Sequence, residues 1–413
     1  MSLDARPDAM DRRTLLRRAG GVALGVAALR ALPAGAATAP PTDTLVFVFL
    51  RGGLDALNTV VPAAEPRYYT ERPTIAVPKA SLLALDSSFG MHPSMRPLLP
   101  AWLAGDLAFV HATGNYGGDR SHFVAQDVID CGVAKPSTAR TGWIARHIAS
   151  RPSNGAPLRS MGIGWTTPLS LTGGGNPVSM KNLEDFGLSV GDAQVAAYEA
   201  RLRELYGGVS HPLAATAGAT VAATSQARRI RALGYQPAAT ASYPATDFGS
   251  ALKTVAECLK AGVGVEAATI DYDGYDLHTG LGAAGTGQLA KLLTDLASGL
   301  AAFRTDLGAR MNSVTVVVVS EFGRRLRENG DGGVDHGAGG LLMLLGGGVR
   351  GRKVYTRWPG LDPADLDDGD LRVTADWRSV LAEVVARRLG NGANLAKVFP
   401  GFTPHFLGVV DPK

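Results

Sequence analysis

Uninterrupted apolar runs stand out along the chain at Thr44–Leu50, residues 107–112 and Val314–Ser320. Each run ends shortly before glycine or a charged side chain. A run without polar alternation is typical of a strand buried on both faces, as in a parallel sheet covered by helices. Residues 266–272 and 341–345 show the same character more weakly, so we expect two further strands there.

Amphipathic segments separate or follow these runs. Residues 288–309 place leucine and phenylalanine at helical spacing and so predict a helix with one apolar face. Residues 376–389 predict a second helix, with Asp376 as its N-cap and Gly390 just beyond its end. Strands that alternate with helices favour an α/β fold with a doubly wound, mainly parallel sheet.

The middle of the chain is less regular. Residues 192–233 are rich in alanine and polar residues, and they predict a helical insertion on the sheet framework. Glycine-rich turns flank this segment at residues 173–176 and 234–237. No stiff linker divides the sequence, so we expect residues 37–413 to form a single domain.

The N-terminus has the layout of an export signal. A basic region with the pair Arg12-Arg13 precedes a mildly apolar stretch at residues 19–29, and small residues at 33–36 suit a signal peptidase. This is typical of a twin-arginine signal over residues 1–36, so we expect recognition by the twin-arginine translocase and a periplasmic or secreted protein. The alternative is an N-terminal anchor helix, but Arg30 ends the run before the roughly 18 apolar residues that a membrane span needs.

The signal also accounts for most of the formal charge of +4. Residues 1–36 hold six Arg and three Asp, which leaves 35 basic and 34 acidic residues in the rest of the chain. A nearly neutral mature chain does not favour a nucleic-acid partner. No later segment has the length of a stable membrane span.

Cys131 and Cys258 are the two cysteines of the chain. In an exported protein they could form a disulfide, but a twin-arginine substrate folds in a reducing cytoplasm, so two buried thiols are an equal alternative. Without a Cys-x-x-Cys pair, a thiolate metal cluster is not favoured.

Candidate chemistry follows the predicted strands, because ligands of an open α/β sheet gather at the carboxyl ends of its strands. Each of these loops offers a carboxylate, a histidine or both. The candidate metal ligands are Asp55, His122, Asp276, His278, Glu321, Asp335 and His336, and the candidate catalytic residues are Ser121 and Arg324. Imidazole with carboxylate favours zinc or manganese, whereas carboxylates alone suit magnesium or calcium.

Each of these residues also has a structural interpretation. Asp55 after two glycines could be a turn residue or a helix cap, and Glu321 could pair with a neighbouring arginine. The pair Asp276 and His278 could belong to a surface turn. His92, His111 and His147 are expected to be structural. The weight of the hypothesis lies in several loops meeting at one edge of the sheet.

Five stretches, at residues 49–55, 121–127, 274–278, 320–324 and 335–337, resemble a bacterial family of unknown function, DUF1501. The resemblance runs from about residue 44 to residue 389, and members commonly carry twin-arginine signals. Tyr275 and Leu277 depart from the tryptophan and threonine expected there. Neither departure removes a candidate ligand.

That family resembles the alkaline phosphatase superfamily, and the resemblance implies an alkaline-phosphatase-like domain with metal ligands at strand ends. It implies one metal held by Asp276, His278 and His336, and a second surrounded by Asp55, Glu321 and Ser121. The superfamily usually has Asp-His where this chain has Glu321-Phe322. His122 could replace the missing histidine, or the site could hold one metal.

These residues together favour an exported metal-dependent hydrolase that acts on a phosphate or related ester, either a small molecule or an envelope polymer. A metal beside Ser121 would lower the pKa of its hydroxyl, and Arg324 would stabilise the transferring oxyanion. The chain lacks the Cys/Ser-x-Pro-x-Arg stretch of ordinary sulfatases and the Gly-x-Ser-x-Gly elbow of serine hydrolases. The alternative is a non-catalytic envelope protein that uses the same fold to bind a glycan, a polymer or a partner.

Overall fold

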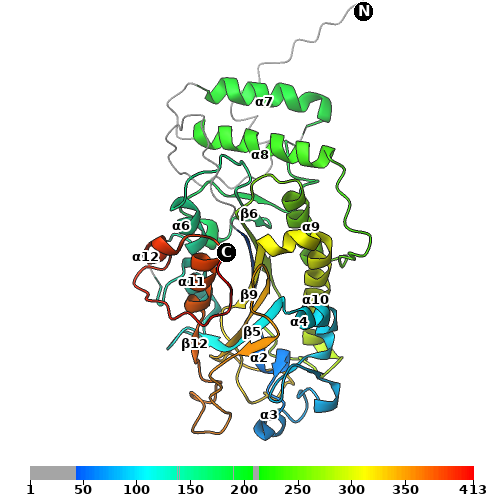
Figure 1. Cartoon of the computed structure of the whole chain (residues 1–413), viewed down its shortest axis with the longest axis vertical. Helices are drawn as coiled ribbons and strands as arrows, with labels where there is room; N and C mark the ends of the chain where they lie inside the picture. Colours follow the sequence, from blue (N-terminus) through cyan, green and yellow to red (C-terminus); the bar gives the residue numbers. More distant parts are fainter. Residues whose placement is uncertain (1–42, 137, 139, 189, 208–213) are drawn as a thin grey trace, which may run out of the picture.

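The computed structural model describes residues 43–413, apart from residues 137, 139, 189 and 208–213. The expected twin-arginine signal at residues 1–36 lies outside the described residues. Figure 1 shows a central sheet with helices on both of its faces. This is the α/β architecture with a mainly parallel sheet that the apolar runs predict.

The central sheet of the described residues has the strand order β11-β5-β10-β9-β1-β8-β6-β7, with β12 beside β5. Its strands are β1 (Thr44–Leu50), β5 (Leu107–Gly114), β6 (Ser160–Ile163), β7 (Val178–Met180), β8 (Ala267–Tyr272), β9 (Val314–Ser320), β10 (Gly340–Gly346), β11 (Lys353–Tyr355) and β12 (Ala375–Asp376). All five predicted strands are therefore present, and β1 and β9 are interior strands.

The pairing is parallel except at one strand. β1 pairs in parallel with β8 and β9, and β6 in parallel with β8. β10 runs antiparallel to both β5 and β9. Because β10 is reversed, it begins at the edge where β1, β8 and β9 end, and this brings an additional loop to that edge.

The helices of the described residues form layers around this sheet (Figure 1). They are α2 (Ala56–Thr59), α3 (Pro66–Glu71), α4 (Leu99–Ala104), α5 (His122–Cys131), α6 (Trp143–Ala149), α7 (Asp192–Tyr206), α8 (Ala214–Ala232), α9 (Asp247–Lys260), α10 (Gly287–Leu307), α11 (Trp377–Arg387) and α12 (Leu395–Val398). Short 3-10 turns are η1 (Lys79–Ser81), η2 (Pro93–Leu98), η3 (Leu169–Leu171), η4 (Gly308–Ser313) and η5 (Gly392–Asn394).

The two faces of β1 explain why its sequence is apolar throughout. Val46 and Val48 belong to a core with side chains of α4, α9 and α10. Leu45 and Phe47 belong to a second core with side chains of α5, α6 and α11. Alternate residues of a strand point to opposite faces, so a strand covered on both sides must be apolar at every position.

Both predicted helices are present with slightly different bounds. α10 ends at Leu307, and the residues after it continue as the 3-10 turn η4, which begins at Gly308 with a positive φ of 51°. Asp376 caps α11 as expected, because its carboxylate accepts a hydrogen bond of 2.8 Å from the backbone N–H of Arg378.

The predicted helical insertion contains α7 and α8, which lie side by side at the top of Figure 1. Ala223, Ala227 and Ile230 of α8 join the core on the α9 and α10 side. The sequence did not reveal a small sheet of β2 (Val60–Val61), β4 (Gly90–Met91) and β3 (Leu83–Ala84), whose strands are too short for a hydrophobic pattern.

Cys131 and Cys258 are both buried and unbonded, on α5 and α9 respectively. The structure thus has the two core thiols rather than the disulfide. Within the described residues, no helix combines the length and the hydrophobicity that a membrane crossing requires.

Candidate functional site

The candidate site lies where β1, β8 and β9 end. Parallel strands have their carboxyl ends at one edge of a sheet, so Gly52, Asp276 and Glu321 follow their strands into the same region. The loop between β9 and the reversed strand β10 leaves and re-enters the sheet at this edge, and it carries His336. α5 begins there as well and contributes His122.

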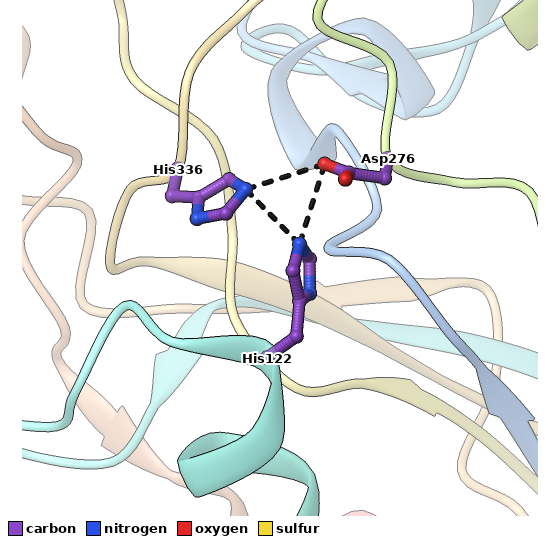
Figure 2. Close-up of side chains that lie close together, drawn as sticks. All are labelled: His122, Asp276 and His336. Atoms are coloured by element: carbon purple, nitrogen blue, oxygen red, sulfur yellow. Dashed lines mark hydrogen bonds and ion pairs between the residues drawn. The ribbon is translucent and has the colours of Figure 1, made fainter.

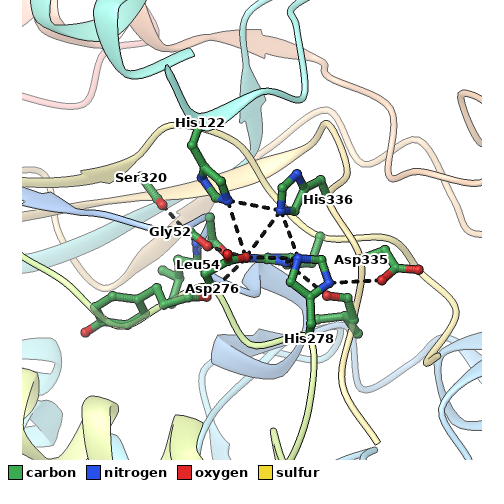
Figure 3. Close-up of polar contacts among 12 residues, drawn as sticks. Gly52, Leu54, His122, Asp276, His278, Ser320, Asp335 and His336 are labelled. Carbon is green, nitrogen blue, oxygen red and sulfur yellow. Dashed lines mark hydrogen bonds and ion pairs between the residues drawn. The ribbon is translucent and has the colours of Figure 1, made fainter. Parts of the chain in front are cut away.

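Three imidazole nitrogens surround one carboxylate oxygen (Figure 3), and Figure 2 shows the contacts among His122, His336 and Asp276. Oδ1 of Asp276 lies 3.3 Å from Nε2 of His122, 3.1 Å from Nε2 of His278 and 3.2 Å from Nε2 of His336. Nε2 of His336 also lies 3.0 Å from the Nε2 atoms of both His122 and His278. Four ligands at about 2.0–2.1 Å from a tetrahedral zinc ion would lie roughly 3.3 Å from one another, which is close to these spacings.

The opposite ring nitrogen of each histidine contacts an acceptor, and this decides the tautomer. The Nδ1 contacts are 2.8 Å from His122 to Oε1 of Glu321, 3.0 Å from His278 to Oδ1 of Asp335, and 2.8 Å from His336 to the carbonyl oxygen of Arg120. An ionised carboxylate and a carbonyl group can only accept, so each Nδ1 donates a proton. In the neutral imidazole, Nε2 then carries a lone pair directed at the cluster.

Four acceptors therefore converge in a small space. Acceptors in contact repel one another unless a cation or a proton lies between them. His122, Asp276 and His336 each offer one ligand atom, and these atoms all lie within 4.8 Å of one another. The arrangement is a possible histidine and aspartate metal site, and the hydrogen bonds to Nδ1 are the outer contacts that such ligands usually have.

Arg324 lies on the buried side of the cluster, where it does not face a substrate. Its side chain is buried and donates to Oδ1 of Asp276 at 2.6 Å and to the carbonyl oxygens of Gly53 and Val334 at 2.7 and 3.0 Å. Burial raises the pKa of Asp276, but Arg324 and the neighbouring imidazoles outweigh this effect and lower the pKa to about 2. Arg324, expected to bind an oxyanion, thus positions the candidate ligand Asp276.

Glu321 is an anchor behind His122. Its carboxylate is buried and bonded by donors on both oxygens: the backbone N–H groups of Gly52 and Gly53, the Nδ1 of His122, the amide of Gln126 and the hydroxyl of Ser320, at 2.8–3.0 Å. Burial raises the pKa of Glu321, but these hydrogen bonds bring it down to about 2. The structure thus places Glu321 beside a ligand. Sequence reasoning missed the role of Gln126, which has no local signal.

Glycine allows two loops to approach the ligands closely. Gly52 has a φ of 116°, and a Cβ there would lie 2.4 Å from the backbone nitrogen of Asp276. A Cβ on Gly333 would lie 2.2 Å from the carbonyl oxygen of His278. Any larger residue at either position would displace the backbone that carries a ligand.

Asp55 does not join the cluster. Its two carboxylate oxygens bond the guanidinium of Arg72 at 2.5 and 3.0 Å, and both side chains are almost completely buried. Arg72 also donates to Oδ1 of Asn58 at 2.7 Å. A carboxylate held in this way serves the packing of α2 and α3, and the sequence around Arg72 gives no signal of the pairing.

Ser121 is the N-cap of α5 and directly precedes His122. Its hydroxyl makes no capping hydrogen bond, while its backbone N–H donates to Asp119 at 2.7 Å.

The hydrogen bond to Glu321 raises the pKa of His122, whereas burial lowers the pKa of His336.

The three histidines expected to be structural are buried outside the cluster. Burial lowers the pKa of His92 and His111 to about 4 and that of His147 to about 3, so all three are neutral in the folded protein. Nε2 of His111 bonds the carbonyl oxygen of Val60 at 2.9 Å, as is typical of a satisfied core histidine.

Comparison with known proteins gives a match to one family model over part of the chain and distant structural similarities. A family described as a protein of unknown function (DUF1501) matches residues 178–375, and this confirms the resemblance over that range. No curated protein matches the chain.

Two solved structures are similar to this chain at low identity. The PsFucS1 sulfatase from Pseudoalteromonas sp. has 11% identity and a TM-score of 0.32, with 90% of this chain and 70% of that chain covered. Ps i-CgsB in complex with k-i-k-neocarrahexaose has 8% identity and a TM-score of 0.30, with 90% and 75% covered.

Proposed function

We propose that this chain is an exported metal-dependent hydrolase that acts on a phosphate or related ester. The observation that carries the proposal is the convergence of three Nε2 lone pairs on one oxygen of Asp276. Nothing in the packing of the sheet requires four acceptors to meet. A bound divalent cation gives the arrangement a physical reason.

The donor set favours zinc or manganese over magnesium or calcium, because imidazole nitrogens outnumber carboxylate oxygens. The ligands we assign first are His122, Asp276 and His336. His278 is the next candidate, because its Nε2 atom contacts both Asp276 and His336. When bound, the ion would supply Lewis acidity to an ester oxygen and lower the pKa of a nearby hydroxyl group.

Ser121 is the nucleophile we propose. It adjoins His122 in the chain, and its hydroxyl is not used to cap α5. The unpaired N–H groups of the first helical turn favour an anion near this position, as a transferring phosphate requires. Arg324 contributes by holding Asp276 and the turn at Gly53 in place.

Export through the twin-arginine pathway is part of the proposal. It rests on the pair Arg12-Arg13 and on the short apolar stretch after it. The substrate would then be a small-molecule ester or an ester of an envelope polymer, met in the periplasm or outside the cell.

A non-catalytic envelope protein is the second candidate function. Two features favour it, because each leaves turnover without a group to stabilise the transferring oxyanion. Arg324 is enclosed by Asp276 and backbone carbonyls, and Asp55 is paired with Arg72 rather than available to a second metal. Such a site could bind an anionic group without turning it over.

Metal analysis of the purified mature protein, combined with an ester hydrolysis assay, tests the proposal. We expect about one zinc or manganese ion per chain, and turnover of 4-nitrophenyl phosphate that a chelator removes and the metal restores. A His336→Ala variant should lose the ion, while His405→Ala, an exposed histidine outside the cluster, should keep it. Protein purified without metal and unable to bind added zinc or manganese would contradict the metal site, and bound metal without turnover of any ester would favour the second candidate.

A further inference from the structure

Two arginine residues beside the candidate metal cluster take no part in the proposed function through their side chains. Arg120 directly precedes Ser121, and its carbonyl oxygen accepts the Nδ1 hydrogen bond of His336 at 2.8 Å. The backbone N–H of Arg325 donates to the carbonyl oxygen of Asp335 at 3.0 Å. The backbone of each arginine is therefore fixed next to the cluster, while its guanidinium group extends away from it to a different partner.

That partner is a buried carboxylate which the two arginines share. Oδ2 of Asp370 lies 2.5 Å from Nη2 of Arg120, and Oδ1 of Asp370 lies 3.3 Å from Nε of Arg325. The side chain of Asp370 is completely buried. A buried acid between two arginines holds both guanidinium groups in place, but its single negative charge neutralises only one of them.

An exposed carboxylate contacts the same two arginines. Oδ2 of Asp368 lies 3.4 Å from Nη1 of Arg120 and 3.3 Å from Nη2 of Arg325. The side chain of Asp368 is 79% exposed, and those of the two arginines are 36% and 37% exposed. Exposed ion pairs contribute little to stability, so another anion can take the place of the Asp368 carboxylate.

Asp368 occupies the tip of a tight hairpin. The backbones of Asp367 and Asp370 exchange two hydrogen bonds of 3.0 Å. Between them, Asp368 and Gly369 have φ angles of 53° and 84°. Positive φ at both central residues is typical of a two-residue hairpin turn of type I′. The carbonyl oxygen of Asp368 also accepts a hydrogen bond of 2.7 Å from Arg325, so the turn stays attached when the carboxylate rotates away.

We propose that Arg120 and Arg325 bind a second anionic group of the substrate, a carboxylate or a phosphate that replaces the carboxylate of Asp368. The inference rests on the proposed function and deepens it by naming the substrate class: an ester whose alcohol part carries a further negative charge. The planar donors of two guanidinium groups match the oxygens of a carboxylate or a phosphate. With Asp368 displaced, one positive charge of the pair is left for the incoming anion. A neutral alcohol part would gain nothing from these arginines.

Calorimetry on the purified mature protein tests this assignment without any turnover. The probes are the bisphosphate of propane-1,3-diol, 4-phosphonooxybutanoate and propyl phosphate, which lacks the second charge. We expect at least one of the first two to bind about tenfold more tightly than propyl phosphate, and the tighter one shows whether the second group is a phosphate or a carboxylate. This preference should weaken as salt is added, because the arginines are partly exposed.

Variants of the arginines and of the hairpin should change the preference in opposite directions. Arg120→Ala and Arg325→Ala should each remove most of it, whereas Asp368→Asn removes the competing charge and should increase it severalfold. The matched controls are Arg327→Ala and Asp362→Asn, exposed residues of the same two segments, and both should keep the wild-type preference. Circular dichroism shows whether each variant is folded. Because Asp368 is exposed, its variant tests the assignment even where loss of an arginine prevents folding.

Equal affinity of the wild type for all three probes would overturn the assignment, and so would an unchanged preference in Asp368→Asn. Where turnover is present, the arginine variants should raise KM for the bisphosphate more than KM for propyl phosphate. Hydrolysis of propyl phosphate together with equal affinity for all three probes defeats this inference alone. A preference that the arginine variants lose, without hydrolysis of any ester, defeats the hydrolase and supports the anion site.

Discussion

Two carboxylates in this protein lie in opposite surroundings: the side chain of Asp306 is buried, and that of Asp276 is 48% exposed. Asp306, near the end of α10, receives hydrogen bonds from donors alone: the hydroxyl groups of Tyr235 and Tyr243, the backbone N–H of Ala238, and the ammonium group of Lys260 at 2.7 Å. Asp276 at the sheet edge has one donor, Arg324, and three imidazole nitrogens whose Nδ1 protons are already used.

The difference separates a structural acid from a functional one. Around Asp306, donors and acceptors balance, so the cluster needs nothing from outside and ties α9 and the segment before it to α10. Around Asp276, three imidazole nitrogens and a carboxylate meet with the guanidinium of Arg324 as the donor among the described residues, and this excess of acceptors is the reason we propose a bound cation there. Charge alone would not distinguish the two carboxylates; exposure and the balance of donors and acceptors do.

The largest expected effect is on metal binding at Asp276. Asp276→Asn keeps the size of the side chain and removes its charge, so we expect metal affinity to fall at least ~100-fold and ester turnover to fall to background. Metal content by mass spectrometry checks this result. Asp306→Asn is the matched control and should retain its metal. Equal metal content in the two variants would contradict the distinction between a structural Asp306 and a metal-binding Asp276.

For the free energy of unfolding, we expect the larger effect from the variant of Asp306 and the smaller effect from the variant of Asp276. Asp306→Asn leaves Lys260 without its ion pair inside the fold, and we expect unfolding to become easier by about 2–4 kcal/mol. Asp276→Asn, measured without metal, should change the free energy of unfolding by less, because the Asp276 side chain is 48% exposed and Arg324 keeps its hydrogen bonds to the carbonyl oxygens of Gly53 and Val334. Denaturant titration of both variants gives the comparison, and a larger loss in Asp276→Asn would contradict it.

A smaller effect is expected from the outer contact of His278. Asp335→Asn weakens the acceptor that orients the ring through Nδ1, and such contacts are worth about 10-fold or more in metal affinity. Asp335 is exposed, so its replacement should leave stability unchanged. Asp331→Asn, in the same loop and also exposed, serves as the control. Unchanged metal affinity in Asp335→Asn would remove His278 from the ligand set.

The smallest effect concerns pH. Burial raises the pKa of Asp306, but the hydrogen bonds from Lys260 and the tyrosines outweigh it, so the pKa lies below its ordinary value of 3.8. A carboxyl group with a lowered pKa in the folded state adds stability above its unfolded pKa and loses it as pH falls through the folded value. The stability difference between wild type and Asp306→Asn should therefore be constant near neutral pH and shrink below about pH 4. A stability difference that grows on acidification would contradict the lowered pKa of Asp306.

The prediction of the fold succeeded where burial acts on consecutive residues. β1 and β9 are apolar at every position because helices cover both faces of the sheet, and that requirement is visible in seven residues. β6, β7 and β11 were missed because strands of three or four residues leave too short a pattern. The reversal of β10 was not visible either, because an apolar run has the same composition in both directions.

The candidate site was predictable in its outline. The rule that ligands gather at strand ends led to Asp276, His278 and His336 from sequence position alone, and the structure brings their side chains together with His122. The roles of Asp55 and Arg324 were not predictable. Asp55 pairs with Arg72, and Arg324 pairs with Asp276, and both contacts join segments that are separate in the sequence.

The sequence by itself therefore determined which long apolar segments are strands, which edge of the sheet carries polar groups, and which residue types could bind a metal. These are local properties, set by hydrophobic periodicity and by the residues that follow each strand. The tertiary structure decided which acceptors meet, because Nε2 of His122 and Oδ1 of Asp276 come from segments more than 150 residues apart. Hydrogen bonding is directional and acts over about 3 Å, so its balance appears only once the chain is folded.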